Sequence, residues 1–422
     1  MSLTYSAVPS LRFYPLWLLA AMFAFAALGN RAVPGAPLGI QVTHLACGAA
    51  ICAVAWWHKD ALADLQFPPA LWWAAGYVVA SVLASAVSAT PDKSIKITAT
   101  MCIGLALAAA IVTVVTTVRH QWLLAMAATV GSFFATIPAI AAGKQLATQL
   151  DGAVINNRPT GAFSDPNTLG TYCALMMLLA LSVLLFSDAL WQKIIAGSAA
   201  LAAGAALALS MSRGAWIGAA LGLLVLCVAH RGARRLLTRV GLITAVVIVG
   251  AMTVAPANSP LSAISDRAAS IGDPSANPYD VRPLTWREAT RQFIQSPFLG
   301  HGPGSFRVLS AQSPSSVQFY PRQHAHNGIL TVLAETGVAG LAPLVGLFAT
   351  LGWALARGIR QLRRADDQKQ LALLAGVLAA LVALTGHLMV DYTLRNPTLL
   401  LTVWALLGLA IASGRNANDL PQ

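Results

Sequence analysis

The feature that most constrains this chain is a succession of long apolar runs separated by mostly short polar connections. Twelve runs are present, each roughly 17–25 residues long, which is the length that an apolar helix needs to cross a bilayer. They begin near Leu11, Leu38, Pro69, Ile95, Gln121, Thr168, Trp191, Gly214, Thr238, Val338, Leu371 and Pro397. The pattern predicts an all-α integral membrane protein with about twelve transmembrane helices.

Composition agrees with a membrane protein and argues against two soluble classes. Only 10% of the 422 residues are charged and 57% are hydrophobic, whereas a soluble domain typically carries about 25% charged residues. The net charge of +12 does not indicate nucleic acid, because Lys and Arg are neither gathered on one face nor interleaved with aromatic residues. They lie mostly between apolar runs, where positive charge sets membrane orientation.

Two basic clusters, in the connections 230–239 and 357–369, predict the orientation. An even number of predicted helices separates them, so they lie on one side, which the positive-inside rule makes cytoplasmic, together with both termini. A polar stretch from 256 to 337 then faces the periplasm of a Gram-negative inner membrane. It is too long for a plain connection, so we expect a partly helical loop domain between the transmembrane parts 1–255 and 338–422.

The arginines of this stretch need an explanation, since positive charge gains nothing from the orientation bias on the outer face. Arg clusters beside a membrane suit a diphosphate, because the guanidinium group bonds phosphate oxygens in pairs. The run from Trp286 to Phe293, which follows Arg282 and includes Arg287, predicts an amphipathic helix. The alternative is a solvated face on which Glu288 pairs with Arg291.

Three further charged residues are expected on the same side. Arg213 lies between two apolar runs, where a charge is costly and usually functional; the alternative is a side chain that reaches the headgroups. Arg158 either adds to phosphate binding or lies among the headgroups. Asp391 either orients a histidine or pairs locally with Arg395.

His324 and His326 lie directly before Asn327. Two histidines at this spacing are poorly placed to share a helix face, and zinc would need a third ligand such as Glu335, so no metal is predicted. A general base is favoured for His326, because the unperturbed pKa of histidine lies near neutrality. The alternative is an interfacial histidine that caps a helix starting at Asn327.

A glycine-rich stretch at 297–304 is a weak candidate for a phosphate cradle, because it lacks the Walker lysine and the strand-to-helix context. A tight turn fits better, with His301 orienting backbone. The five cysteines contain no CxxC pair, which indicates neither a disulfide framework nor a zinc site. No cofactor is predicted.

Several of these residues match a known signature. His326 and Asn327, followed after nine residues by Gly337 and after two more by Gly340, resemble the signature of the O-antigen ligase family. Arg213, with an aliphatic residue four positions on, resembles the second signature of that family.

The resemblance extends to architecture. Arg282, four residues before Trp286, and the glycine-rich stretch beyond it fit the wider O-antigen ligase and polymerase superfamily of membrane glycosyltransferases. The predicted layout of about twelve helices, with one large, partly helical periplasmic loop domain, is similar too and is GT-C-like.

The resemblance implies a reaction. A glycan is moved from undecaprenyl diphosphate to a sugar hydroxyl of lipid A–core at the periplasmic face, with inversion and without a required metal. His326 would take the proton of the acceptor hydroxyl, and Arg213 and Arg282 would hold the diphosphate. Supporting roles would fall to Arg158, Arg287, His324, Asn327, Gly337, Gly340, Trp286, His301 and Asp391.

Three alternatives stay open. An O-antigen polymerase would use another lipid-linked glycan as acceptor, and a protein O-oligosaccharyltransferase would use Ser or Thr. The single His-Asn motif and the compact loop favour the ligase. A transporter is more distant, because Lys96, His44 and His387 are the main polar groups within the predicted helices, and coupled transporters usually show more.

Overall fold

The computed structural model describes residues 14–36, 40–64, 67–146, 158–254, 259–272, 280–314 and 324–418. Its helices before residue 210 are α1 (Tyr14–Phe25), the 3-10 helix η2 (Ala26–Gly29), α2 (Val42–Trp57), α3 (Lys59–Ala63), α4 (Pro69–Ala86), α5 (Pro91–Val114), α6 (Val118–Gly131), α7 (Phe133–Leu146), α8 (Pro166–Phe186) and α9 (Leu190–Leu209). The later helices are α10 (Arg213–Ala229), α11 (Arg231–Val254), α12 (Pro260–Ala269), α13 (Arg282–Gln295), α14 (Phe306–Ala311), α15 (Gly328–Arg364), α16 (Gln368–Leu388) and α17 (Pro397–Asn418).

The chain is an all-α, multi-pass membrane protein. Every predicted apolar run coincides with a helix, although the predicted starts at Leu11 and Leu38 lie outside the described residues. Within the described residues, 8 helices are long and apolar enough to cross a membrane, with α6 and α7 counted as one span, and three shorter apolar helices accompany them. The number of twelve crossings stays a prediction.

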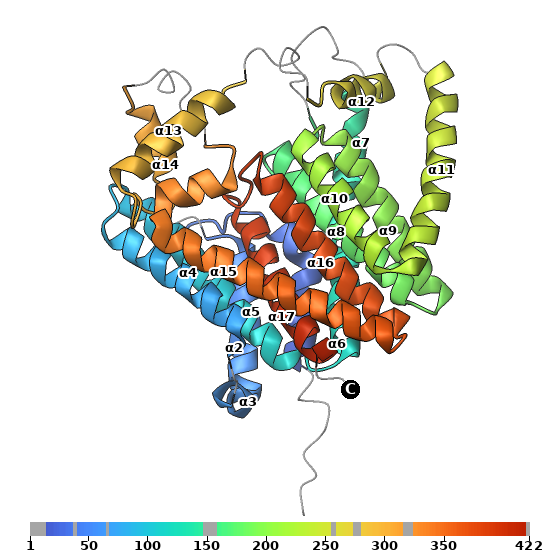
Figure 1. The fold of residues 1–422 in the computed structure, drawn as a ribbon, viewed down its shortest axis with the longest axis horizontal. Helices are drawn as coiled ribbons and strands as arrows, with labels where there is room; N and C mark the ends of the chain where they lie inside the picture. Colours follow the sequence, from blue (N-terminus) through green and yellow to red (C-terminus); the bar gives the residue numbers. More distant parts are fainter. Residues whose placement is uncertain are drawn as a thin grey trace, which may run out of the picture.

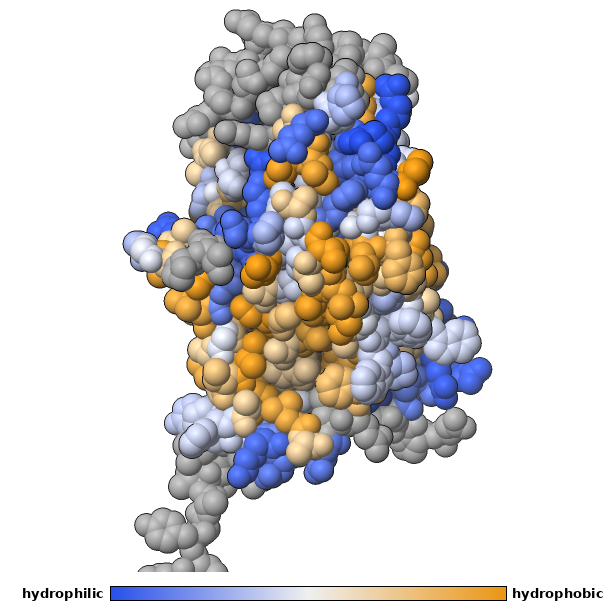
Figure 2. Space-filling view, turned by 90° about the vertical axis from the view of Figure 1, so that its left-hand side faces the viewer, coloured by the Kyte–Doolittle hydropathy of each residue, from blue (hydrophilic) through white to orange (hydrophobic). Residues whose placement is uncertain are grey.

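The surface has the division that a bilayer requires. Figure 2 shows hydrophobic residues gathered around the middle of the molecule and hydrophilic residues toward both ends. Large apolar side chains such as Leu201 of α9, Leu224 of α10 and Val345 of α15 are exposed. Exposed apolar surface of this extent is typical of a face that meets lipid.

The two basic connections lie on one side, as the sequence predicted. Arg363, at the end of α15, donates to the carbonyl of Ala229, at the end of α10 (3.0 Å). From this end, α16 runs for 21 residues, or about 30 Å at 1.5 Å per residue, which matches the hydrocarbon core of a bilayer. The short helices α12, α13 and α14 gather at the opposite end (Figure 1), which we call the loop end.

Helices α10 and α16 approach closely through glycines. Gly214, Gly218 and Gly222 lie four residues apart on one face of α10. A Cβ atom at Gly218 would lie 2.4 Å from the carbonyl oxygen of Ala383, and one at Gly214 would lie 2.5 Å from Val390 Cγ2. Small residues at this spacing let helix backbones touch in a membrane, where helices have no hydrophobic drive to associate. The start of α10 is thereby fixed against the end of α16.

A break at Gly337 divides α15, where the backbone turns to φ +62°. A Cβ atom there would lie 2.3 Å from the carbonyl oxygen of Phe298, so only glycine fits. The break frees the amides of Val338 and Ala339, which donate instead to the carbonyls of Pro297 (2.9 Å) and Phe298 (3.0 Å). The predicted membrane run near Val338 is the second part of α15.

The glycine-rich stretch forms the expected tight turn against this break. Gly300, Gly302 and Gly304 all have positive φ. His301 bonds through Nε2 to the carbonyl of Gln292 (3.0 Å), so its side chain holds backbone.

Helix α13 confirms the amphipathic helix predicted over 286–293. The alternative of a solvated Glu288–Arg291 pair is wrong in one respect. The pair forms at 2.6 Å, but Glu288 is only 2% exposed and also accepts hydrogen bonds from Gln292 and Ser313 (both 2.8 Å). Glu288 therefore ties α13 to the segment after α14.

The contact of α10 with α16 can be tested by filling it. Gly218→Val should lower the free energy of unfolding by about 1–3 kcal/mol or prevent folding, because overpacking a tight contact costs about that much. The measurement is the melting midpoint in detergent, followed by size-exclusion chromatography. Gly197→Val is the control, because a Cβ atom there meets nothing within 4 Å. Equal midpoints for the two variants would contradict the close packing.

Candidate functional site

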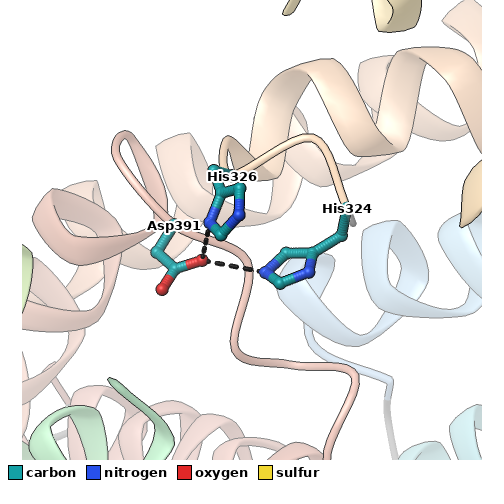
Figure 3. Close-up of side chains that lie close together, drawn as sticks. All are labelled: His324, His326 and Asp391. Carbon is teal, nitrogen blue, oxygen red and sulfur yellow. Dashed lines mark hydrogen bonds and ion pairs between the residues drawn. The ribbon is translucent and has the colours of Figure 1, made fainter. Parts of the chain in front are cut away.

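Two histidines and a carboxylate from distant segments meet at the loop end. His324 and His326 lie in the irregular segment before α15, and Asp391 lies in the turn after α16. Asp391 Oδ1 accepts hydrogen bonds from His324 Nε2 (3.1 Å) and from His326 Nδ1 (3.0 Å), as Figure 3 shows. The two imidazole rings lie 4.0 Å apart between centroids. Two roles were considered for Asp391, a bond to histidine and a local pair with Arg395. The structure shows the bond to histidine.

Arg395 bridges this group to another loop. Its guanidinium donates to Asp165 Oδ2 (2.9 Å) and to His324 Nδ1 (2.7 Å). The local Asp391–Arg395 pair considered above is therefore wrong. Asp165 itself caps α8 through its side chain.

Asn327 begins α15, and its own side chain provides the cap. Asn327 Oδ1 accepts the amide of Leu330 (3.0 Å), and its Nδ2 donates to the carbonyl of Met389 (2.9 Å). The alternative of a histidine that caps this helix is therefore wrong. Asn327 instead anchors the histidine segment to the end of α16, because it directly follows His326 and its side chain bonds to Met389.

The hydrogen bonds define the tautomers of both histidines. Arg395 is only a donor, so His324 Nδ1 carries the lone pair and His324 Nε2 carries the hydrogen. His326 donates through Nδ1 to Asp391, which places its lone pair on Nε2. A histidine in this form can accept a proton at Nε2 while the carboxylate stabilises the resulting cation.

Burial alone would raise the pKa of Asp391, but the hydrogen bonds from His324 and His326 outweigh it and hold the pKa well below its ordinary value. Asp391 is therefore ionised at neutral pH. Burial lowers the pKa of His324, although the bond to Asp391 opposes the shift. His324 is consequently neutral at pH 7.

His326 adopts an unusual backbone conformation, with φ +49°. A side chain other than glycine in this region costs about 1–2 kcal/mol. Such strain persists where surrounding contacts impose it, and it is often found at functional sites. Here Asp391 holds the ring and Asn327 holds the next residue, so the conformation follows from the contacts of the site.

The same group has the spacing of a metal site, because one ligand atom from each of His324, His326 and Asp391 lies within 4.8 Å of the others. The third ligand is thus Asp391 and not Glu335, whose carboxylate bonds to the amides of Gly304 and Phe306. The donor set fits a cation poorly. A metal would need the lone pair of His324 Nε2, and the bond from Arg395 leaves the hydrogen there.

Three arginines lie beside this group, and each donates a hydrogen bond to a main-chain carbonyl. Arg158 Nε donates to Ser210 (2.8 Å) and Arg213 Nη1 donates to Ser270 (2.8 Å). The third, Arg267 of α12, donates from Nε to Met211 (3.3 Å). These bonds fasten α12 and the 158–165 loop to the turn between α9 and α10. Arg158 is part-buried in protein, so the headgroup alternative does not describe it.

The positive charges of these arginines repel one another. Burial, and then the charge of Arg267, lower the pKa of Arg158 to about 10. Burial and the charges of Arg213 and Arg282 lower the pKa of Arg267. Among the described residues, no carboxylate lies within 4.0 Å of Arg158, Arg213 or Arg267, and Arg282 pairs only with Asp280 at 3.5 Å. Such an excess of positive charge favours binding of an anion.

The structure separates Arg282 from Arg287. Arg282, at the start of α13, interacts electrostatically with Arg267. Arg287 is exposed, and its Nε donates to the carbonyl of Pro283 one turn back (3.3 Å). Trp286 is 37% exposed beside it. Arg282 therefore joins the arginine cluster of Arg158, Arg213 and Arg267, whereas Arg287 is exposed to solvent.

Two residues of this arrangement, Arg267 and Asp165, and one contact, that of Arg395 with His324, were not predicted from the sequence. Arg267 lies on the short helix α12, and the sequence around it does not indicate which residue its side chain contacts. Asp165 and Arg395 are 230 residues apart, and no local pattern predicts such a pairing.

An apolar cavity of about 380 Å³ adjoins the site. Gly328 and Ile329, directly after the histidine segment, form part of its wall, together with Met389 and Tyr392 on either side of Asp391. The rest of the wall comes from α4, α5, α15, α16 and α17. The cavity therefore extends from the residues that follow the histidine segment into the region of the membrane helices, where a lipid chain can lie.

Residues 198–345 match the family model described as O-antigen ligase. The match agrees with the family resemblance seen in the motifs and includes Arg213, Arg267, Arg282 and His326; Asp391 lies outside it. No curated protein matches the chain. The match indicates an enzyme of the O-antigen ligase or polymerase type, which transfers glycans.

The lowered pKa of His324 predicts a pH dependence of stability. In the unfolded chain histidine titrates near about 6.5, so below that pH the unfolded chain binds more protons than the folded one. The stabilisation is complete above this value and is lost as the pH falls below it. The protonation of Asp391 does not change the stability in this pH range, because the stabilisation that its ionised form provides is lost only below about pH 4.

We therefore expect the melting midpoint of the wild type to fall between about pH 7.5 and about pH 5.5, and to fall less for His324→Gln. His58→Gln, at the end of α2, should retain the wild-type profile. Identical profiles for the wild type and His324→Gln would show that His324 is not held neutral.

Proposed function

We propose that the protein is an O-antigen ligase. It would transfer a glycan from undecaprenyl diphosphate to a sugar hydroxyl of lipid A–core. The observation that carries the proposal is the Asp391–His326 pair lying beside an arginine cluster at one end of a membrane bundle. Lipid A–core as acceptor is favoured by the O-antigen ligase match and the single His-Asn motif.

His326 acts as the general base. The acceptor hydroxyl oxygen attacks the anomeric carbon, and its proton passes to His326 Nε2. Asp391 holds the ring through Nδ1 and stabilises the imidazolium that forms. The bond between the anomeric carbon and the phosphate oxygen breaks, and its electron pair stays on the diphosphate.

The arginine cluster stabilises this leaving group. Arg158, Arg213, Arg267 and Arg282 supply fixed positive charge where negative charge develops. Guanidinium groups also bond phosphate oxygens in pairs. The cluster thus supplies the charge that a divalent metal supplies in other transferases, and the mechanism requires no metal.

A double displacement is disfavoured by the role of Asp391. It would need one carboxylate as nucleophile and a second carboxyl group as acid and base. Asp391 instead holds the ring of the base, because its Oδ1 accepts from His324, from His326 and from the amide of Tyr392 (2.8 Å). A single displacement with inversion is therefore proposed.

The location is proposed from charge. Arg363 and the 230–239 connection lie at one end of α16, and the site lies at the other. The positive-inside rule makes the basic end cytoplasmic, with both termini on that side. The site then lies at the periplasmic face of the bacterial inner membrane.

Deleting the gene tests the function. A ligase loss should leave lipid A–core without long chains on a lipopolysaccharide gel, while polymer accumulates on undecaprenyl diphosphate. Complementation with His326→Ala should give the same result at normal protein level, because removing a general base costs at least about a hundredfold. Core bearing one repeat unit would indicate a polymerase, and unchanged lipopolysaccharide with altered glycoproteins would indicate a protein oligosaccharyltransferase.

Two arginines of α13 provide a matched pair for the diphosphate site. Arg282→Gln should reduce transfer by about tenfold or more, because it removes a charge-assisted bond in the transition state. Arg287→Gln should remain within about twofold of wild type, as is usual for an exposed charge. Initial rates of transfer by the purified variants provide the measurement. The reverse order of effects would place the diphosphate on the outer face of α13.

A further inference from the structure

A second cavity with a strongly positive wall lies at the loop end. It has a volume of about 320 Å³. Lys93 and Lys96 of α5 and Arg307 of α14 contribute cations to the wall, together with Arg395. His324 forms part of the same wall. We call this space the lysine cavity.

The positive charge of the lysine cavity is not neutralised by the chain. In the described part of the chain, Lys93, Lys96 and Arg307 have no carboxylate within 4.0 Å, since the ion pairs found there involve other residues. Glu335 lies in the wall, but its carboxylate accepts the amides of Gly304 and Phe306. That carboxylate fixes the turn leading to α14, so the cavity keeps an excess of positive charge.

The lysine cavity and the arginine cluster are built by different helices. The arginine cluster is fastened to α8, α10 and α12, whereas the cavity is walled by α5, α14, α15 and α17. Figure 1 shows α12 and α14 on opposite sides of the loop end. The histidine segment connects the two, because His324 borders the cavity and His326 lies next to it.

An inverting displacement needs two such sites. The nucleophile and the leaving group occupy opposite faces of the anomeric carbon. With the diphosphate on the guanidinium groups, the lysine cavity, which borders His324, offers the acceptor a separate site. Lysine ammonium groups act as point charges and suit a phosphate that needs no bidentate partner.

The apolar cavity adds a second requirement for the occupant. Tyr392, Leu394 and Leu400 line both the apolar cavity and the lysine cavity. A molecule that fills both must carry an anionic group next to its hydrocarbon chains. Phosphate close to acyl chains is the chemistry of a phosphorylated glycolipid.

We propose that the lysine cavity binds a phosphate of the acceptor glycolipid, with acyl chain in the adjoining apolar cavity, and so presents the acceptor hydroxyl to His326. The proposal rests on the proposed function. It adds that the acceptor must be phosphorylated, and that donor and acceptor are held by separate cationic sites.

The binding test compares bisphosphorylated lipid A with the same lipid after removal of both phosphates, by native mass spectrometry of the purified full chain. The wild type should bind the phosphorylated form about tenfold more tightly, and Lys93→Gln/Lys96→Gln should lose this preference. Lys59→Gln/Lys193→Gln, which removes two exposed lysines elsewhere, should retain it. No preference in the wild type, or equal binding of phosphatidylglycerol, would overturn the proposal.

The kinetic test separates the two substrates. In glycan transfer, Lys93→Gln/Lys96→Gln should raise the KM for the phosphorylated acceptor about tenfold and leave the KM for the lipid diphosphate donor unchanged. A rise in the donor KM alone would overturn the proposal by assigning the cavity to the donor. If the wild type binds phosphorylated lipid A selectively but transfers no glycan to it, the proposed function fails and the binding site stands.

Discussion

The close packing of α10 against α16 is the contact on which the site depends. Gly218 brings the α10 backbone against the carbonyl of Ala383, and Gly214 seats the start of α10 against Val390. Arg213 therefore begins its helix next to the turn that carries Asp391. Since membrane helices have no hydrophobic drive to associate, this fit of small residues is what holds the cation and the carboxylate in register.

The second constraint is Asp391 itself. Its carboxylate organises His324 and His326, which stand in an irregular and strained segment. The two bonds outweigh the effect of burial and keep the pKa of Asp391 low. One ionised group thus sets the tautomer of the base and receives support from Asn327, which anchors the segment to Met389. The base is positioned by polar contacts that bridge two helix ends.

Much of the fold was predictable because the physical signals are local. Apolar runs of membrane length marked the helices, and the basic connections joined by Arg363 were correctly placed on one side. One glycine of the His-Asn signature has a conformational role, because Gly337 breaks α15 at a position where a Cβ atom would lie 2.3 Å from the carbonyl oxygen of Phe298. The site was predictable only in part. Contacts such as Asp165 with Arg395, or Arg267 with Met211, join segments whose approach depends on the whole bundle, and no spacing in the sequence encodes them.

The central claim is that a general base lies between a diphosphate site and a separate acceptor site. An experimental structure with a bound lipid diphosphate sugar tests it most directly. The account predicts phosphate oxygens within about 3 Å of Arg213 and Arg267, with the anomeric carbon on the His326 side. Phosphate density beside Lys93 and Lys96, with the arginine cluster empty, would contradict it.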